Sequence, residues 1–465
     1  MTAPPHPVQP RRVAVVGGGW AGLAAAVRAV GDGHHVTVFE ASRHWGGRAR
    51  TLPTTLTTDG PPGHRAGDTL QLDNGQHILI GAYTDTLRCM RLVGVDTEAV
   101  LHRLPLRLTY PDGTGLALPA WPAPLDVLAG VLTAKGWTWH DKWSLLRAAL
   151  RWQLAGFRCN AANTVADLCA HLPQRLQDGF IEPLCVSALN TPAARASGQV
   201  FLRVLQDALF STPQGSNLLL PTRPLGELWP DAAVRWLAAR PSSARLQLAC
   251  RVTQLARNPA DTTWHLNGQD FDHVVWANYD KKVPLALDGI DKSATHRFSY
   301  IASKSMQFEP IATVYAWAQA CGAPPQAAPP GTPGSSTSAS AHTLPHPMLA
   351  LAPTQAYPAQ FVFDKGQLGG PHGLLAFVIS ASQGDARHLQ QAVQAQAAAQ
   401  LGLQLQCIRT IVEKRATFAC TPDAPRPAMY AAPGLTLAGD HVQGPYPATL
   451  EGAIRSGWAA AGAVR

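Results

Sequence analysis

Charged residues are scarce in this sequence of 465 residues: Asp, Glu, Lys and Arg make up 15% of it, against about 25% in typical soluble domains. Hydrophobic residues make up 46%. This balance excludes a chain that is disordered throughout, because disordered chains are rich in charge and poor in apolar residues. With about 100–200 residues per domain, we expect about two to four domains.

Long hydrophobic runs and paired cysteines are also missing. No run reaches the roughly 18 apolar residues that a membrane-spanning helix needs. The first ten residues, MTAPPHPVQP, contain no apolar segment of the signal-peptide type, so we do not expect secretion by that route. The eight cysteines include no Cys-x-x-Cys pair, a pattern typical of free thiols in a reducing compartment. We therefore predict a cytoplasmic protein, free or peripheral on the inner face of the cell membrane.

Acidic residues are outnumbered by basic ones. Lys and Arg number 38 against 30 Asp and Glu, which gives a net charge of +8. This excess fits an anionic cofactor or an anionic membrane surface as well as it fits a nucleic acid. Of these partners we do not expect a nucleic acid.

Residues 322–347 contain no charged residue and are made mainly of Pro, Ala, Ser, Thr and Gly. Such a segment cannot pack a core, so we predict a flexible surface insertion. His342 and His346 lie four residues apart there, but the neighbouring prolines disfavour the helix that would bring them together. We therefore expect no metal site.

The N-terminal part of the chain carries a strand, a glycine-rich turn and a helix in immediate succession. The apolar run Val13–Val16 predicts a buried parallel strand, and the alanine-rich run Leu23–Val30 predicts a helix. Between them lies the pattern Gly17-x-Gly19-x-x-Gly22. The first glycine permits a tight turn, the second lets the backbone approach a pyrophosphate, and the third lets helix and strand pack closely.

A second predicted strand, Val36–Phe39, ends at Glu40, 18 residues after Gly22. A carboxylate at this place accepts hydrogen bonds from ribose hydroxyls, while the helix N-terminus faces the phosphates. An acidic residue favours an unphosphorylated ribose, and hence NAD or FAD rather than NADP.

Two later features favour FAD. Gly46-Gly47-Arg48 lies where an extended dinucleotide would cross the domain, and Arg48 can neutralise a phosphate. Far along the chain, a predicted strand at Leu435–Ala438 is followed by Gly439-Asp440 and by a helix that starts near Thr449. Asp440 could bind the ribityl chain or a pyrophosphate-linked water. The helix amides would favour the negative charge of a reduced flavin.

The elements of a dinucleotide-binding sheet are thus separated along the chain. Further strands are predicted at Leu246–Thr253, Thr263–Leu266 and His273–Ala277. We predict one domain from residues 11–80, 215–280 and 420–465. The second, substrate-binding domain is predicted from residues 81–214 and 281–419.

The segment Trp121–Arg158 holds five of the 13 tryptophans and five basic residues against two acidic ones. Helical spacing is plausible from His140 to Phe157. One interpretation is a helical lid packed into the core, and the other is an interfacial segment anchored in a membrane. The packed lid is favoured because tryptophan is highly buried on average.

Three blocks carry a family pattern: LDNGQHILIGAY at 72–83, PTRPLGEL at 221–228 and PATLEGAIRSG at 447–457. With the glycine motifs, they resemble the flavin-dependent amine oxidase and phytoene desaturase superfamily, and within it the squalene-associated branch, the hydroxysqualene dehydroxylases. The resemblance covers most of the chain except 322–347 and its surroundings. The sequence departs from the family pattern at WANYD (276–280) and HVQGPY (441–446).

The resemblance implies an α/β fold with a Rossmann-like FAD domain built from discontinuous segments. It also implies an α+β substrate domain with a mixed sheet, helices and a long apolar tunnel. The implied partners are a long apolar isoprenoid substrate and an electron donor that the sequence does not identify. The residues expected at FAD are Gly17, Gly19, Trp20, Ala21, Gly22, Glu40, Ala41, Gly46, Gly47, Arg48, Asn74, Gly75, Gln76, His77, Val252, Gly439, Asp440, Thr449, Leu450 and Glu451.

The implied reaction is the reductive removal of the hydroxyl of hydroxysqualene to give squalene, on the route to hopanoids. An acid should protonate the leaving oxygen, and His77 and Asp73 are the candidates. Alternatively, His77 only forms a hydrogen bond near the flavin, and Asp73 orders the turn before Asn74.

Other functions remain open at this stage. A polyene desaturase of the same fold would move the hydride from substrate to flavin. A non-redox prenyl-lipid carrier of the GDP-dissociation-inhibitor type is disfavoured by the intact FAD motifs. An amine oxidase is disfavoured because no aromatic cage or lysine–flavin motif is evident.

Overall fold

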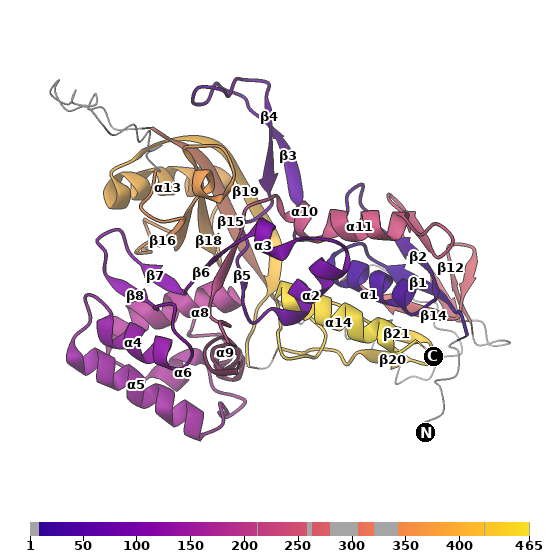
Figure 1. Ribbon diagram of the computed structural model, residues 1–465, viewed down its shortest axis with the longest axis horizontal. Helices are drawn as coiled ribbons and strands as arrows, with labels where there is room; N and C mark the ends of the chain where they lie inside the picture. Colours follow the sequence, from indigo (N-terminus) through magenta and orange to yellow (C-terminus); the bar gives the residue numbers. More distant parts are fainter. Residues whose placement is uncertain are drawn as a thin grey trace.

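The computed structural model describes residues 9–211, 213–257, 263–279, 306–319, 343–422 and 424–464. A domain built on a parallel sheet lies at the right of Figure 1, and an antiparallel sheet with a group of helices lies at the left. Most of the predicted insertion, residues 322–342, lies outside the described residues.

The first domain is built on a six-stranded sheet with the order β10-β2-β1-β14-β21-β20, in which only β20 runs antiparallel to its neighbour. The predicted strands at its centre are confirmed, although Leu246–Thr253 is strand only up to Gln247. The strands are β1 (Arg12–Val16), β2 (His35–Phe39), β10 (Ala244–Gln247), β14 (His273–Trp276), β20 (Tyr430–Ala432) and β21 (Leu435–Leu437).

Both faces of this sheet are covered, which explains why β1 is apolar at successive positions. Val13 and Val15 pack against the helical face, while Ala14 and Val16 pack against the opposite face. The helices on the first face are α1 (Trp20–Gly31), α11 (Pro230–Ala238) and α14 (Leu450–Gly462). The second face is covered by an antiparallel sheet of β11 (Leu255–Arg257), β12 (Trp264–Leu266) and β13 (Gln269–Phe271).

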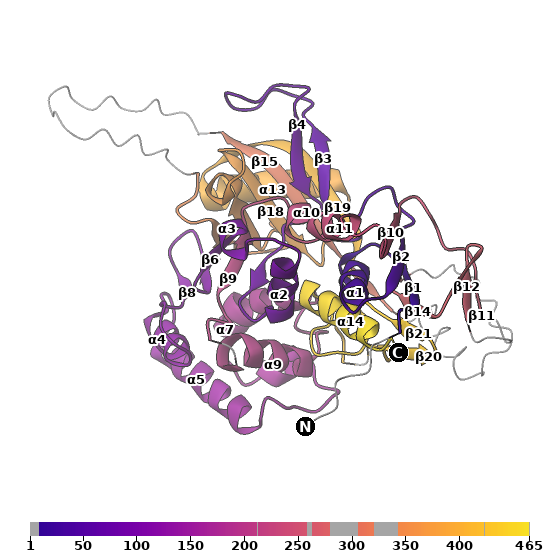
Figure 2. The ribbon, with the colours of Figure 1, turned by 45° about the vertical axis from the view of Figure 1, so that its right-hand side comes forward.

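Helices α1 and α14 lie side by side (Figures 1 and 2) although they come from opposite ends of the chain. Their closest approach is at Gly457, where a Cβ atom would overlap the carbonyl oxygen of Ala21. The absence of a side chain at this position therefore sets how closely the C-terminal helix packs on the N-terminal one.

The second domain contains a five-stranded sheet with the order β16-β17-β18-β15-β19. All its pairings are antiparallel, so the prediction of a mixed sheet was wrong. The physical reason is that β16, β17 and β18 follow one another through short connections, which reverse the chain direction at each step. The strands are β15 (Phe308–Gln319), β16 (Met348–Ala350), β17 (Phe361–Asp364), β18 (Leu374–Ser380) and β19 (Gln404–Phe418).

Helix α13 (Ala386–Leu401) packs on one face of this sheet through Leu389, Val393 and Ala397. The other face, with Tyr315 and Trp317, belongs to a large apolar cluster shared with the helices between residues 125 and 211. These helices are α4 (Leu125–Thr133), α5 (Trp139–Leu154), α6 (Val165–Cys169), α7 (Gln174–Leu176), η1 (Gln177–Ile181), α8 (Glu182–Leu189), α9 (Gly198–Gln206) and η2 (Asp207–Ser211).

The remaining elements are short, and they lie within the second domain or between the two domains. They are β3 (Thr51–Thr55), β4 (Thr69–Asp73), β5 (Leu79–Ile80), α2 (Thr84–Leu92), α3 (Thr97–Val100), β6 (Leu101–Leu104), β7 (Arg107–Thr109), β8 (Gly115–Ala117), β9 (Leu218–Pro221), α10 (Leu225–Leu228) and η3 (Lys365–Leu368). Within the described part of the chain, no helix has both the length and the apolar character needed to cross a bilayer.

The favoured interpretation of residues 121–158 as a packed helical lid was wrong for three of the five tryptophans. Trp121, Trp139 and Trp143 are 59%, 66% and 65% exposed. Trp152 is buried, and Trp137 is half-buried against Phe180. The segment therefore packs through one face and leaves its other face in contact with solvent.

Candidate functional site

The glycine turn lies at the carboxyl end of β1, where parallel sheets of this type bind ligands. Gly17 has a positive φ of +112°, and a Cβ there would come within 2.7 Å of the carbonyl oxygen of Ala277. A Cβ at Gly22 would overlap the carbonyl oxygen of Gly17. The backbone is therefore packed too tightly for any side chain at Gly17 or Gly22.

Helix α1 begins directly after this turn with Gly19 as its N-cap, and no side chain caps it. A helix N-terminus without a capping side chain presents backbone N–H groups and a partial positive charge. Beside it, Gly46 N donates to Gly18 O at 2.9 Å, and Trp20 Nε1 donates to Ala49 O at 2.9 Å. The two predicted glycine segments thus lie against each other at the start of α1.

Glu40 follows β2 and lies next to the turn. Its Oε2 accepts from Gly18 N and its Oε1 accepts from Ser42 N, each at 2.7 Å. The backbone carbonyl of Glu40 accepts from Cys250 N at 2.8 Å, which brings the segment with the buried Val252 alongside. Each carboxylate oxygen has further lone pairs, so Glu40 can still accept from a ribose hydroxyl.

Arg48 and Asp440, separated by 392 residues, form an ion pair. Arg48 also donates to Ala416 O at 3.0 Å. Burial alone would raise the pKa of Asp440, but the charge of Arg48 and hydrogen bonds from Arg48 and His441 hold the pKa well below its usual range. Asp440 is therefore ionised, and the Arg48 guanidinium that we expected at a phosphate is shared with it.

Asn74 joins this pair to the second domain. Its Nδ2 donates to Arg48 O at 2.7 Å, and its Oδ1 accepts from Arg50 N at 3.0 Å. Nδ2 also lies 3.4 Å from Glu413 Oε2 on β19. The Asn74 amide thus fixes the backbone of residues 48–50 against the antiparallel sheet.

The structure gives Asp73 a supporting position. Its Oδ1 accepts from Thr51 Oγ1 at 2.8 Å and from Leu225 N at 2.9 Å, and the residue is buried. Its backbone carbonyl accepts from Tyr315 Oη at 3.0 Å. Asp73 therefore ties β4 to α10 and to the antiparallel sheet.

His77 lies close to Gly75, with 2.7 Å between His77 Nδ1 and Gly75 O. A carbonyl only accepts, so Nδ1 carries the proton of this hydrogen bond and Nε2 is left with a lone pair. Burial lowers the pKa of His77 despite the Gly75 carbonyl and the nearby Asp73. At neutral pH His77 thus presents an acceptor at Nε2 rather than an acidic proton.

Lys365 is a charged residue that the sequence analysis missed. Its Nζ donates to Gln76 Oε1 at 3.1 Å, so a cation lies at the predicted Asn74–His77 block. Burial lowers the pKa of Lys365, while Asp73 opposes that shift. No motif marks this lysine, because its place depends on the turn after β17.

The aromatic groups around Asp440 were also missed. The ring of Tyr279 lies 5.4 Å from that of His441 and 5.1 Å from that of Phe308. Tyr279 and His441 belong to the two stretches that depart from the family pattern, and the structure brings those stretches into contact.

The N-terminus of α14 is capped by Thr449, whose Oγ1 accepts from Gly452 N at 2.9 Å. We expected Glu451 at FAD, but its side chain is fully buried and is engaged elsewhere. It accepts from Thr86 N, Thr86 Oγ1 and Asp85 N. In this first turn of α14, Leu450 and Glu451 can therefore contact a ligand only through their backbone. A cavity of about 150 Å³ lies beside this turn, lined by Asp440, Tyr446 and Arg455 among others.

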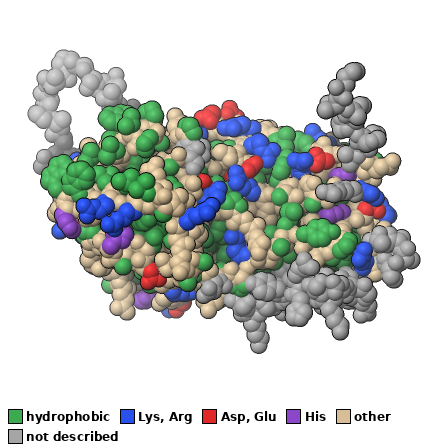
Figure 3. Space-filling model, turned by 90° about the horizontal axis from the view of Figure 1, so that it is seen from below, with side chains coloured by type: hydrophobic (Ala, Val, Ile, Leu, Met, Phe, Trp, Pro, Cys, Tyr) green, Lys and Arg blue, Asp and Glu red, His purple; other side chains and the backbone are tan. Residues whose placement is uncertain are grey.

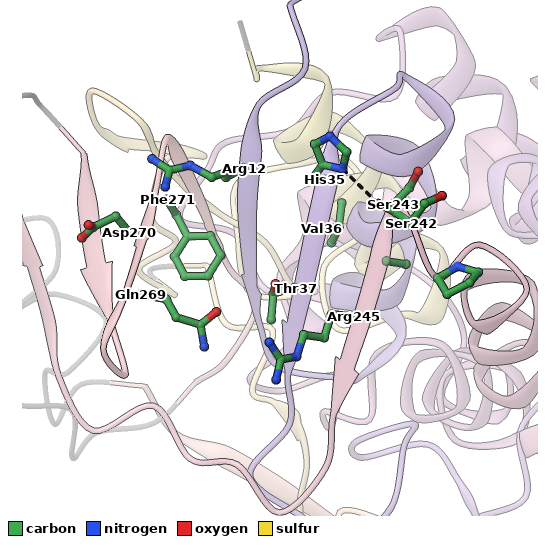
Figure 4. A pocket seen from close by; sticks show the side chains of 12 residues that line it. Arg12, His35, Val36, Thr37, Ser242, Ser243, Arg245, Gln269, Asp270 and Phe271 are labelled. Atoms are coloured by element: carbon green, nitrogen blue, oxygen red, sulfur yellow. Dashed lines mark hydrogen bonds between the residues drawn. The ribbon is translucent and has the colours of Figure 1, made fainter.

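A larger cavity of about 350 Å³ lies elsewhere (Figure 4). It is lined by Arg12, His35 and Arg245, and His35 Nδ1 lies 3.1 Å from Ser242 O. Arg12 and His35 begin their strands, so this cavity lies at the amino ends of the sheet, opposite the glycine turn. It is therefore separate from the candidate site.

Comparison with known proteins agrees with this geometry. The family model for flavin-containing amine oxidoreductases matches residues 20–281 and 302–465. Hydroxysqualene dehydroxylase from Zymomonas mobilis is 26% identical, with 96% of this chain and 97% of that protein covered. The protein of the same name from Rhodopseudomonas palustris is 26% identical, with 96% of each covered.

Among solved structures, an oxidoreductase from Methanosarcina mazei is similar in fold, with a TM-score of 0.65 and 15% identity. The alignment covers 96% of this chain and 99% of that one. Together with the discontinuous parallel-sheet domain and the antiparallel sheet, this likeness establishes an amine oxidase fold.

The cofactor that the family implies is FAD, and the residues present fit it. The turn at Gly17 and Gly22 leaves room for backbone only, and the uncapped start of α1 supplies N–H donors for a pyrophosphate. Glu40 offers an acceptor for a ribose. The chain belongs to the family of flavin-containing amine oxidoreductases and is an FAD-dependent oxidoreductase.

Proposed function

We propose that this oxidoreductase reductively removes the hydroxyl of hydroxysqualene to give squalene. The observation that carries the proposal is the likeness to two hydroxysqualene dehydroxylases, which extends over 96% of the chain rather than over the FAD motifs alone. A role in squalene and hopanoid synthesis, an isoprenoid substrate and a separate electron donor belong to the same proposal.

The interior beside the candidate site is apolar, which is the environment that a long hydrocarbon substrate would need. Leu72 precedes Asp73 in the sequence, and Tyr315 donates a hydrogen bond to the backbone carbonyl of Asp73. Both Leu72 and Tyr315 belong to the large apolar cluster. That cluster continues to Phe180 and to the inner face of α5. These side chains are packed against one another, so a hydrocarbon substrate would need a channel along this cluster, where burial of its apolar area would stabilise it.

When bound, reduced FAD supplies the hydride that replaces the hydroxyl. The protein must then deliver a proton to the leaving oxygen, because hydroxide is a poor leaving group. His77 can carry this proton only at Nε2 and only after protonation, since Nδ1–H is directed at Gly75 O. Lys365 carries a proton at Nζ and lies against the same block, where it donates to Gln76. We propose Lys365 as the alternative donor.

Asp73 and Asn74 act as positioning residues in this proposal. Asp73 holds β4 through Thr51 and Leu225, and Asn74 holds the backbone of Arg48. Because Asp73 Oδ1 and the Asn74 amide are both engaged in holding backbone segments, we assign them positioning roles.

The test is to reduce the bound flavin without oxygen, add hydroxysqualene, and follow flavin reoxidation together with squalene formation. We expect one molecule of squalene to form for each flavin that is reoxidised. Reduced flavin that stays reduced in the presence of hydroxysqualene contradicts the proposal. Oxidised enzyme that desaturates phytoene or squalene assigns the reverse hydride direction instead.

Two variants identify the proton donor. If Lys365 is the donor, Lys365→Met slows reoxidation by about 100-fold or more, the usual contribution of general acid catalysis, while His77→Gln retains the rate. The opposite pattern assigns the role to His77. Lys414→Met, an exposed lysine on β19, is the matched control and should leave the rate unchanged.

A further inference from the structure

Large apolar side chains are exposed mainly on one surface of the molecule. In the described residues, 11 large hydrophobic side chains are exposed, and eight of them lie between residues 121 and 154. We call these eight the α4–α5 surface. They are Trp121, Leu125, Leu128, Leu132, Trp139, Trp143, Leu150 and Leu154.

Helix α5 is apolar on two opposite sides. Its inner side is buried through Leu145, Ala148 and Trp152. On its outer side, Trp139, Trp143, Leu150 and Leu154 fall within about 60° of arc, given 3.6 residues per turn. The inner side accounts for packing in the core, so the outer stripe has no partner within the described fold.

Helix α4 continues this surface. Leu125, Leu128 and Leu132 follow the i, i+3, i+7 spacing of one helix face and are 57%, 43% and 37% exposed. The helix carries one charged residue, Asp126, and that residue is buried. Lys142 of α5 donates from Nζ to Leu132 O at 2.7 Å, which joins the ends of the two helices.

The exposed charges on residues 121–158 are all positive. The two acidic residues, Asp126 and Asp141, are 6% and 4% exposed, and Asp141 is engaged in a capping box with Thr138. The five basic residues are Lys135, Lys142, Arg147, Arg151 and Arg158. Arg147 and Arg151 follow the apolar stripe of α5 along one edge. Figure 3 shows hydrophobic side chains at the end of the molecule that carries α4 and α5, with Lys and Arg beside them.

We propose that the α4–α5 surface docks this protein on an anionic lipid bilayer. Exposed tryptophans at headgroup depth, leucines that reach the acyl boundary and a basic rim are the features that stabilise a helix lying in a membrane interface. The charge complementarity argues for an anionic lipid surface rather than for a second copy of this chain, because two copies would bring like charges together.

The docking surface is continuous with the interior of the second domain. The inner side of α5 packs in the same apolar cluster as Leu72 and Tyr315, which lie beside the candidate site. A substrate dissolved in the bilayer would thus meet the protein on the side where its apolar interior begins. The docking proposal itself rests on exposure and charge and does not depend on the substrate.

The test is co-sedimentation of the FAD-loaded protein with vesicles of phosphatidylcholine, with or without phosphatidylglycerol, in the absence of substrate. We expect binding to the anionic vesicles and weaker binding to the neutral ones. Trp139→Ser/Trp143→Ser should weaken it about tenfold through lost apolar insertion. Arg147→Glu/Arg151→Glu should weaken binding to anionic vesicles by at least about 25-fold, because each lost basic residue contributes about fivefold and the added glutamates are repelled by the anionic lipid.

Two control variants match these changes elsewhere on the surface. Leu92→Ser/Tyr430→Ser removes exposed hydrophobic residues from α2 and β20, and Arg65→Glu/Arg387→Glu reverses exposed charges far from α5. Both should bind like the unaltered protein, and unchanged flavin absorbance reports that every variant is folded.

Equal binding by all variants, or no vesicle binding by the unaltered protein, would overturn the proposal. So would a dimer in gel filtration that the tryptophan variant abolishes. Because no substrate is present, failure of the proposed reaction does not affect this result.

Discussion

Helices α1 and α5 are both rich in apolar residues, but they occupy opposite environments. Ten of the twelve residues of α1 are buried, against four of the sixteen in α5. The residues of α1 are mostly small, which lets it lie between the sheet and α14 with close backbone contacts. The residues of α5 are large and point both inward and outward. The comparison teaches that residue size and angular distribution, rather than hydrophobic content, decide how a helix is buried.

The largest expected effect tests the close packing of α1. Gly22→Val would place a branched side chain against the carbonyl of Gly17. We expect the free energy of unfolding to fall by about 3 kcal/mol or more, and bound FAD to be lost. Urea unfolding and flavin absorbance measure these changes. The matched control is Gly31→Ala in the same helix, where a Cβ meets nothing within 4 Å and stability should not fall.

A second prediction separates the two sides of α5. Trp152 is 8% exposed, and Trp152→Ala should lower the free energy of unfolding by about 3–5 kcal/mol, because it leaves a cavity in the apolar cluster. Trp143, on the same helix, is 65% exposed, and Trp143→Ala should change the free energy by less than about 0.5 kcal/mol. Equal losses in urea unfolding would mean that the outer stripe is packed in solution.

A third prediction concerns the buried carboxylate of α14. Glu451→Ala removes the acceptor for Asp85 N, Thr86 N and Thr86 Oγ1, and should lower the free energy of unfolding by about 2–3 kcal/mol. The exposed Glu98 is the control, and Glu98→Ala should have an effect below about 0.5 kcal/mol. An effect of Glu451→Ala on FAD affinity without a loss of stability would assign Glu451 to the cofactor instead.

The smallest effect is a pH dependence carried by Asp440. The folded protein lowers the pKa of Asp440, so its contribution to stability is fully present above the ordinary carboxyl pKa of about 4. It is lost as the pH falls further, towards the lowered pKa. In FAD-free protein at neutral pH, Asp440→Asn should cost about 1–2 kcal/mol, a modest value because Arg48 is 39% exposed. Unfolding curves at neutral and acidic pH measure this difference. A difference that grows on acidification would contradict the assignment, and Asp32→Asn in an exposed pair should show little change.

Local pattern was sufficient to predict the centre of the first domain. The strand–turn–helix unit around Gly17, the acidic residue after β2 and the start of a helix near Thr449 each depend on a few adjacent residues, and the structure contains all of them. The glycine turn and the acidic residue predicted NAD or FAD, because the chemistry of phosphate and ribose binding is tied to backbone and to one carboxylate. The later segments at Gly46-Gly47-Arg48 and Gly439-Asp440 then favoured FAD.

Long-range contacts were not predictable in this way. The expectation for Arg48 missed its pairing with Asp440, which depends on how segments 392 residues apart meet. Lys365 has no motif, and it reaches Gln76 only because the turn after β17 faces β4. The exposure of Trp139 and Trp143 was missed because average burial says nothing about a helix with two apolar sides.

The position of β14 between β1 and β21 has a consequence for synthesis on the ribosome. The glycine turn and α1 are translated early, but the strand, the aspartate and the helix that complete their surroundings belong to residues 435–462. Until these residues emerge, the β14 edge of the sheet is unpaired and the side of α1 that packs on α14 is uncovered. The nucleotide pocket can therefore be completed only after residues 435–462 have been synthesised.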